Sequence, residues 1–159
     1  MASDDHLRLD HQLCVALYNA SRAVNGCYRP LLDDIGFTYS QYTVMLVLWE
    51  RQSTTLRDLT ELLHLDSGTL SPLLQRLERL GLITRNRDHS DERVLQVTIT
   101  EAGLVLSDRA AVAQRSVEEM TGMKTDSLVA LRDELNDLAE RMRRARADHD
   151  AAQRSLAGR

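Results

Sequence analysis

Hydrophobic side chains recur at helical spacing along most of this chain. Between residues 7 and 27 they return every three or four positions, which predicts a long helix. The residues that set this spacing are Leu7, Leu13, Leu17, Ala20 and Val24. Gly26 and Pro30 then predict a break before a short helical piece that ends at Gly36.

Three further helices are predicted next. TYSQ at 38–41 is a capping-box sequence, so a helix is expected from there to Arg51. A short helix capped by Thr54 or Thr55 follows, and its leucines lie on one side.

The third of these helices begins at Asp66 or Ser67 and ends at Gly81, the residue type most common just after a helix. Its apolar side is formed by Leu70, Leu73, Leu74, Leu77 and Leu80. Two strands are expected over 82–86 and 94–100, because apolar and polar side chains alternate in the second. From there the chain is predicted to be helical again. The order of elements indicates a mainly α fold with a small β wing, a winged helix-turn-helix.

Composition adds little to this prediction. With 159 residues, 43% apolar and 28% charged, the chain has room for one domain with helical extensions. The net charge of −4 provides no general attraction for nucleic acid. The start MASDDHLRLD lacks the basic segment of a signal peptide. The longest apolar run, at 42–49, is too short to span a membrane. We therefore expect a cytoplasmic protein with reduced thiols.

A DNA-reading surface is predicted on the side of the 67–80 helix that faces away from its leucines. Small hydroxyl residues at a helix start allow close approach to phosphates and bases, and longer side chains reach further along the groove. The candidates on this helix are Ser67, Thr69, Ser71, Gln75 and Arg76. The wing adds Arg85, Arg87 and Arg93, with Asp91 placed to orient Arg93 for a narrow minor groove. The alternative interpretation is a solvated helix face and a charged turn.

Two cysteines, Cys14 and Cys27, lie in the first predicted helix. Thirteen residues in one helix separate them by about 20 Å, far beyond the reach of a disulfide within one chain. Cys14 is expected about two turns into the helix, too deep for the helix dipole to act on it strongly. A buried packing role is the ordinary interpretation of such a cysteine.

Four segments carry a family resemblance: LCVALYNASR around Cys14, CYRPLLDDIGFTYSQYTVMLVLWE, LDSGTLSPLLQRLERLGLITR and DERVLQVTITEAG. Over about residues 7–105 the chain resembles the MarR family of winged-helix regulators, and in particular its organic-hydroperoxide-sensing branch, the OhrR-type repressors. The resemblance implies one domain over 1–159, in which 38–100 contacts DNA and helices over 7–36 and 101–150 form a homodimer.

The resemblance also implies a mechanism. Such repressors bind a pseudo-palindromic operator when reduced, and organic hydroperoxides oxidise the cysteine that matches Cys14 to a sulfenic acid. Tyrosines matching Tyr28 and Tyr39 hydrogen-bond the reduced sulfur. Tyr28 is about 21 Å from Cys14 along a continuous helix, so these tyrosines would have to come from the partner subunit. No cofactor is implied.

The fate of the oxidised thiol remains open at this point. Some members of the branch use a resolving cysteine in the C-terminal helices, and this chain has none after Cys27. We favour a one-cysteine mechanism in which the sulfenic acid condenses with a low-molecular-weight thiol or is over-oxidised. A Cys14–Cys27 bridge between subunits is the alternative.

Two other functions compete with this one. Leu17 and Tyr18, with Val44 and Leu48, could line a peroxide pocket, or they could be core. A MarR-type regulator that responds to a small aromatic or acidic ligand is the main alternative. A cysteine peroxidase is disfavoured because nothing else resembles a catalytic group. The histidines are too scattered to predict a metal site.

Overall fold

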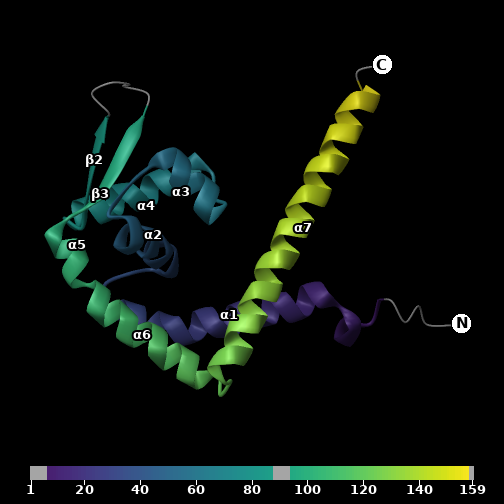
Figure 1. Ribbon diagram of the computed structural model, residues 1–159, viewed down its shortest axis with the longest axis horizontal. Coiled ribbons are helices and arrows are strands. Elements are labelled where there is room, and N and C mark those ends of the chain that lie inside the picture. Colours follow the sequence, from purple (N-terminus) through teal and green to yellow (C-terminus); the bar gives the residue numbers. More distant parts are fainter. Residues whose placement is uncertain (1–6, 88–93, 158–159) are drawn as a thin grey trace, which may run out of the picture. The chain divides into compact units, whose positions relative to one another are not determined.

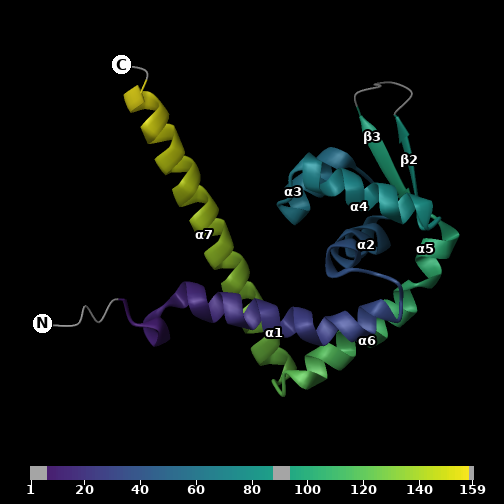
Figure 2. The same ribbon diagram turned by 180° about the vertical axis from the view of Figure 1, so that it is seen from behind.

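The structure is a computed structural model that describes residues 7–87 and 94–157. The chain divides into two compact units, Met1–Val117 and Glu118–Arg159. The first unit contains a winged helix-turn-helix, seen from both sides in Figures 1 and 2. In the part of the chain that the structure describes, no helix is long and apolar enough to cross a bilayer.

The first long helix, α1 (Leu13–Asp33), differs from the prediction at both ends. It begins at Leu13, after a short 3-10 turn, η2 (Leu9–His11). It also continues without a break through Gly26 and Pro30. Proline removes only its own N–H bond, and the last turn is held by the burial of Leu32, which is 1% exposed. The expected break before a separate short helix is therefore wrong.

The three helices of the DNA-binding part begin where their caps predict. In α2 (Tyr39–Arg51), the Gln41 backbone donates to Thr38 Oγ1 at 3.3 Å and the Thr38 backbone donates to Gln41 Oε1 at 2.8 Å. Thr55 caps α3 (Leu56–Leu63), and Asp66 caps α4 (Ser67–Arg79). The capping box and both side-chain caps are confirmed.

The wing is a three-stranded antiparallel sheet in the order β1-β3-β2. Strands β2 (Ile83–Arg87) and β3 (Leu95–Ile99) form the predicted hairpin. The third strand, β1 (Ser53–Thr55), was not predicted. Its three polar residues have no apolar alternation, and they become a strand only because they pair with the other edge of β3.

The core lies between α2, α4 and the sheet. Its fully buried side chains come from α2, α3, α4 and strands β2 and β3, and they include Val44, Met45, Leu48, Leu59, Leu70, Leu74, Leu77, Ile83 and Val97. Val44 and Leu48 are therefore core residues, which is the alternative to lining a peroxide pocket. Leu80, expected on the apolar side of α4, is 50% exposed because the helix has already ended at Arg79.

The chain after the wing is helical, as predicted, in α5 (Glu101–Val105), α6 (Ser107–Met120) and α7 (Thr125–Ala157). Trp49 of α2 donates its indole N–H to the Gly103 carbonyl at 2.9 Å, which fastens α5 to the winged part. The dimerisation role expected for 7–36 and 101–150 stays a prediction.

Candidate nucleic-acid interface and thiol site

Helix α4 presents a polar face opposite its buried leucines, as the sequence predicts. Ser67, Thr69, Gln75 and Arg76 are exposed, and Ser71 is half-buried. Asp66 orients the start of this helix, because it accepts hydrogen bonds from both the backbone and the hydroxyl of Thr69 at 2.8 Å. These bonds lower the pKa of the Asp66 carboxyl.

The hydroxyls at the start of α4 are partly engaged within the helix. Ser71 Oγ donates to the Ser67 carbonyl at 2.7 Å, and Thr69 donates to Asp66. Gln75 and Arg76 are the longest exposed side chains further along the predicted face. All five α4 residues remain predicted DNA contacts, and Gln75 and Arg76 are the ones whose length lets them reach furthest along a groove.

The wing arginines have different surroundings. Arg87, at the end of β2, is exposed. Arg85 instead turns back to α4, where its Nη2 lies 2.7 Å from Glu78 Oε2 and its side chain is only 21% exposed. Asp91 and Arg93 lie outside the residues that the structure describes. Glu78 was not singled out in the sequence, although its place seven residues before Arg85 allowed such a pair.

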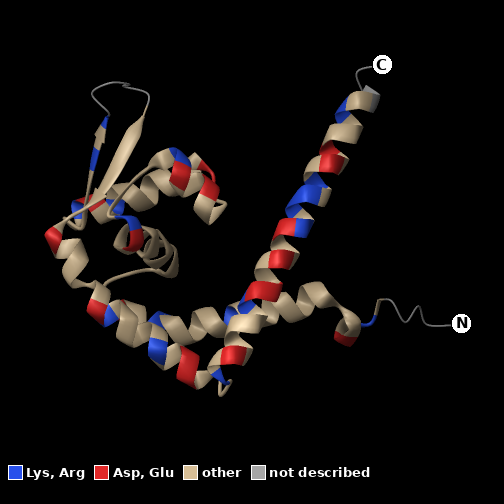
Figure 3. Cartoon of the chain, viewed as in Figure 1, with Lys and Arg blue, Asp and Glu red and all other residues tan. Residues whose placement is uncertain are grey.

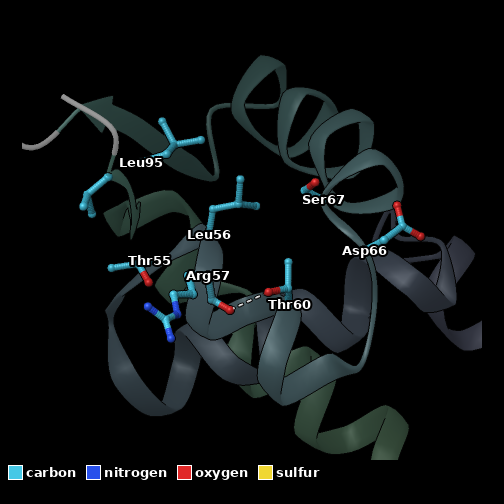
Figure 4. A pocket seen from close by; sticks show the side chains of 8 residues that line it. Thr55, Leu56, Arg57, Thr60, Asp66, Ser67 and Leu95 are labelled. Atoms are coloured by element: carbon cyan, nitrogen blue, oxygen red, sulfur yellow. Dashed lines mark hydrogen bonds between the residues drawn. The ribbon is translucent and has the colours of Figure 1, made fainter. Parts of the chain in front are cut away.

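A pocket of about 560 Å³ lies between α3, the start of α4 and β3 (Figure 4). Leu56 and Leu95 are among the side chains that line it. Arg57, at its edge, is paired with Glu61 at 3.0 Å. Among the described residues that line this pocket, the charge of Arg57 is thus balanced by its pairing with Glu61 and by Asp66 at the edge.

The two cysteines are well separated on α1. Cys14 is exposed and is the second residue of the helix, whereas Cys27 is half-buried. The expectation that Cys14 lies two turns into the helix is wrong, because the turn before it is a separate 3-10 element. Cys14 therefore lies at the positive end of the helix dipole. Asp10, in the preceding turn, is paired with Arg8 at 2.8 Å, which lowers the pKa of the Asp10 carboxyl.

Three tyrosines gather where α1 ends and α2 begins. The ring of Tyr28 lies 5.6 Å from that of Tyr39 and 5.5 Å from that of Tyr42. Tyr39 is 40% exposed, while Tyr42 is buried and continues the cluster to Trp49 at 6.2 Å. The fold thus brings Tyr28 and Tyr39 together, although eleven positions separate them. Tyr42 was not predicted as part of this cluster, although its place one turn after Tyr39 is a signal for it.

Leu17 and Tyr18 lie on the surface of α1, at 37% and 61% exposure. Arg22 donates to Tyr18 Oη at 3.3 Å and lies 5.6 Å from the centre of its ring. Tyr18 therefore contacts Arg22, which lies one helical turn after it, on the side away from Cys14. The placement of Leu17 and Tyr18 at a peroxide pocket stays a prediction.

Sequence comparison places this architecture in a known family. Residues 27–109, just over half of the chain, match the family described as transcriptional regulator SarA/Rot. The chain belongs to this family. It is thus a winged-helix transcriptional regulator of MarR type, and the resemblance noted in the sequence is confirmed.

Relatives named as transcriptional regulators cover most of the chain. It is 40% identical over 136 residues to the organic hydroperoxide resistance transcriptional regulator of Bacillus subtilis, covering 86% of this chain and 92% of that protein. It is 42% identical over 139 residues to the regulator TtmR of Methylorubrum extorquens, covering 87% of this chain and 71% of that protein. As predicted, the family consists of regulators and not of enzymes.

Solved structures of AbfR show the same fold. Reduced AbfR bound to DNA matches with a TM-score of 0.73 and 36% identity, covering 87% of this chain and 96% of that one. AbfR of Staphylococcus epidermidis also matches with a TM-score of 0.73, and further structures show AbfR in overoxidized form bound to DNA and in disulfide form.

Proposed function

We propose that this protein is a thiol-based repressor that releases operator DNA when organic hydroperoxides oxidise Cys14. The observation that carries the proposal is the pairing of Tyr28 and Tyr39, whose ring centres lie 5.6 Å apart. Tyr28 lies toward the C-terminal end of α1, and Cys14 lies near the N-terminal end of the same helix. Two phenols side by side can donate to the same anionic sulfur.

The thiol and the tyrosines must meet between two chains. Cys14 and Tyr28 lie on one continuous helix, fourteen residues or about 21 Å apart. A homodimer therefore contains two such sites, each with Cys14 from one chain and Tyr28 and Tyr39 from the other. Leucines on α7 at heptad spacing, Leu128, Leu131, Leu135 and Leu138, support self-association.

The chemistry needs only the thiol and the peroxide. The Cys14 thiolate attacks the terminal peroxide oxygen, an S–O bond forms as the O–O bond breaks, and the alkoxide leaves and takes up a proton as an alcohol. The sulfur loses two electrons and the peroxide gains two. A low-molecular-weight thiol then condenses with the sulfenic acid, forming a disulfide and releasing water.

Cys27 is not required in this scheme. It lies next to Tyr28 in sequence, so a bridge from Cys14 to Cys27 of a second chain is the competing fate. Its half-buried thiol is less accessible to small oxidants than the exposed Cys14. We infer that mixed-disulfide formation or over-oxidation is the main outcome.

The reduced dimer is proposed to bind a pseudo-palindromic operator. One α4 helix enters a major groove at each half-site, and each wing contacts the neighbouring minor groove. The likeness to AbfR bound to DNA supports this arrangement. The contacts predicted from the sequence are the α4 residues Ser67, Thr69, Ser71, Gln75 and Arg76, with Arg85, Arg87, Asp91 and Arg93 on the wing.

The decisive experiment is an operator-binding titration with cumene hydroperoxide. The wild type and Cys27→Ser are expected to release DNA, and Cys14→Ser is expected to stay bound. Release of DNA by Cys14→Ser, at the peroxide concentration that releases the wild type, would contradict the proposal. If cumene hydroperoxide releases DNA from neither the wild type nor Cys14→Ser, but a phenolic acid releases DNA from both, the protein responds to a ligand instead.

A further inference from the structure

Thr69, the only threonine of α4, has its hydroxyl group engaged within the protein. The Thr69 backbone N–H donates to Asp66 Oδ1 at 2.8 Å, and Thr69 Oγ1 donates to Asp66 Oδ2 at the same distance. These bonds lower the pKa of the Asp66 carboxyl, so at neutral pH it is ionised and can only accept hydrogen bonds. The hydroxyl proton of Thr69 therefore points to Asp66 and is not offered to DNA.

Gly68 leaves room for this arrangement. A Cβ atom at Gly68 would lie 3.0 Å from Asp66 Oδ1, which is closer than ordinary van der Waals contact. Without that atom, the Asp66 carboxylate reaches both donors of Thr69 across the first turn of α4. The side chain of Thr69 is thus held in one conformation, although threonine usually divides between two conformations in a helix.

Thr69 lies on the exposed side of α4, in line with Arg76. The two residues are separated by two helical turns, so they lie on one side of the helix, about 10 Å apart along its axis. Both are exposed, whereas Leu70 and Leu74 are buried. A helix that places Arg76 in a major groove therefore brings Thr69 to the base edges as well.

The start of α4 has no positive charge with which to attract phosphate. Residues 67–75 are uncharged, and the charged positions of α4 follow at its C-terminal end (Figure 3). Asp66, directly before the helix, is negative. Contacts made at this end therefore contribute to discrimination between bases and not to general affinity for the DNA backbone.

We propose that Thr69 recognises thymine through its methyl group, and that Asp66 is the positioning residue that sets this choice by holding the Thr69 hydroxyl. A free threonine hydroxyl can donate to a phosphate or to a base acceptor, whereas a hydroxyl whose proton is engaged leaves the methyl group as the main contact. Thymine is the one base that displays a methyl group in the major groove. The inference rests on the proposed contact of α4 with operator DNA, but not on Cys14 or its oxidation.

Replacement of thymine by deoxyuridine in the bound duplex tests the methyl contact directly. The reduced wild type first selects preferred duplexes from a random DNA pool, and each thymine of a half-site is then replaced in turn. One replacement is expected to weaken wild-type binding by about 3- to 10-fold, as the loss of one methyl contact should. Thr69→Ser lacks the methyl group and should bind both duplexes equally. Thr69→Val keeps a methyl group without the hydroxyl and should still prefer thymine.

Asp66→Ser tests the positioning role. Serine is a good helix cap, but its single oxygen accepts from the Thr69 backbone and leaves no second oxygen for the Thr69 hydroxyl. The preference for thymine over uracil should therefore fall in Asp66→Ser. It should return when Asp66→Ser is combined with Thr69→Val, because valine holds one conformation in a helix by itself. If circular dichroism shows that Asp66→Ser is unfolded, Asp66→Thr takes its place.

Thr60→Ser is the matched control, because it removes the same methyl group from α3, where the Thr60 hydroxyl donates to the Arg57 carbonyl at 2.6 Å (Figure 4). It should respond to every replacement as the wild type does. Equal responses of the wild type and Thr69→Ser, or a response that Thr69→Ser keeps and Thr69→Val loses, would overturn the methyl contact. A wild-type response in Asp66→Ser would overturn the role of Asp66. If the wild type selects no sequence from the pool, the proposed operator binding fails together with this inference.

Discussion

Glu78 and Arg85 join the DNA-reading helix to the wing through three hydrogen bonds. Glu78 Oε2 accepts from Arg85 Nη2 at 2.7 Å and Nε at 3.0 Å, and Glu78 Oε1 accepts from the Arg85 backbone at 3.1 Å. One carboxylate thus holds both the side chain and the main chain of β2. We therefore expect Arg85 to act on DNA binding by positioning the wing, while the direct contact predicted from the sequence stays a prediction.

Removal of this pair should weaken operator binding without changing its salt dependence. Glu78→Gln and Arg85→Gln are each expected to lower affinity by about 3- to 10-fold, and the double variant by no more than either one, since both break the same link. Fluorescence anisotropy over a salt series measures this. A direct phosphate contact by Arg85 would instead leave Glu78→Gln unimpaired and reduce the salt slope for Arg85→Gln alone.

The same pair makes stability depend on pH. The hydrogen bonds from Arg85 lower the pKa of Glu78 below its ordinary value. A lowered pKa contributes stability above the unfolded-state pKa, and this contribution is lost as the pH falls through the folded-state pKa. Urea unfolding at pH 7 should therefore give a larger unfolding free energy for the wild type than for Glu78→Gln. The difference should be about 1 kcal/mol or less, because the Glu78 side chain is 37% exposed and solvent screens the pair. The difference should shrink below pH 4. A constant difference from pH 7 to pH 3 would contradict it.

Gly103 is needed for packing between α5 and the wing. A Cβ atom there would overlap the Leu82 carbonyl oxygen and lie 2.7 Å from Ile99 Cγ1. Gly103→Ala should cost about 1–3 kcal/mol of unfolding free energy. Gly26→Ala in α1 is the matched control, because no atom lies within 4 Å of its added Cβ and alanine favours helices. Equal stability of the two variants, at one protein concentration, would contradict the prediction.

Trp49, the single tryptophan, should report oxidation of the thiol. Its ring lies 6.2 Å from that of Tyr42, which contacts Tyr28 and Tyr39. When the Cys14 sulfur changes its bonding to these tyrosines, the surroundings of Trp49 should change with them. One equivalent of cumene hydroperoxide is expected to shift Trp49 emission in the wild type but not in Cys14→Ser. The same shift in both would indicate direct damage to the indole.

Local side-chain patterns predicted the order of the helices, the caps of α2, α3 and α4, and the polar face of α4. These features depend on side chains a few positions apart, such as Thr38 with Gln41 or Asp66 with Thr69, so they are visible in one dimension. The family resemblance likewise singled out Cys14, Tyr28 and Tyr39, and the helix rise separated the thiol from Tyr28.

The partners of many residues depend instead on how the elements pack together. β1 is a strand because it pairs with an edge of β3. Arg85 lies beside Glu78 because the chain turns back between α4 and β2. Tyr42 contacts Tyr28 and Tyr39 where α1 and α2 meet. Local spacing does not encode such contacts, because they depend on how separate elements pack. The start of α1 at Leu13 was missed because apolar spacing continues through the 3-10 turn, whose different backbone hydrogen bonds leave no trace in that spacing.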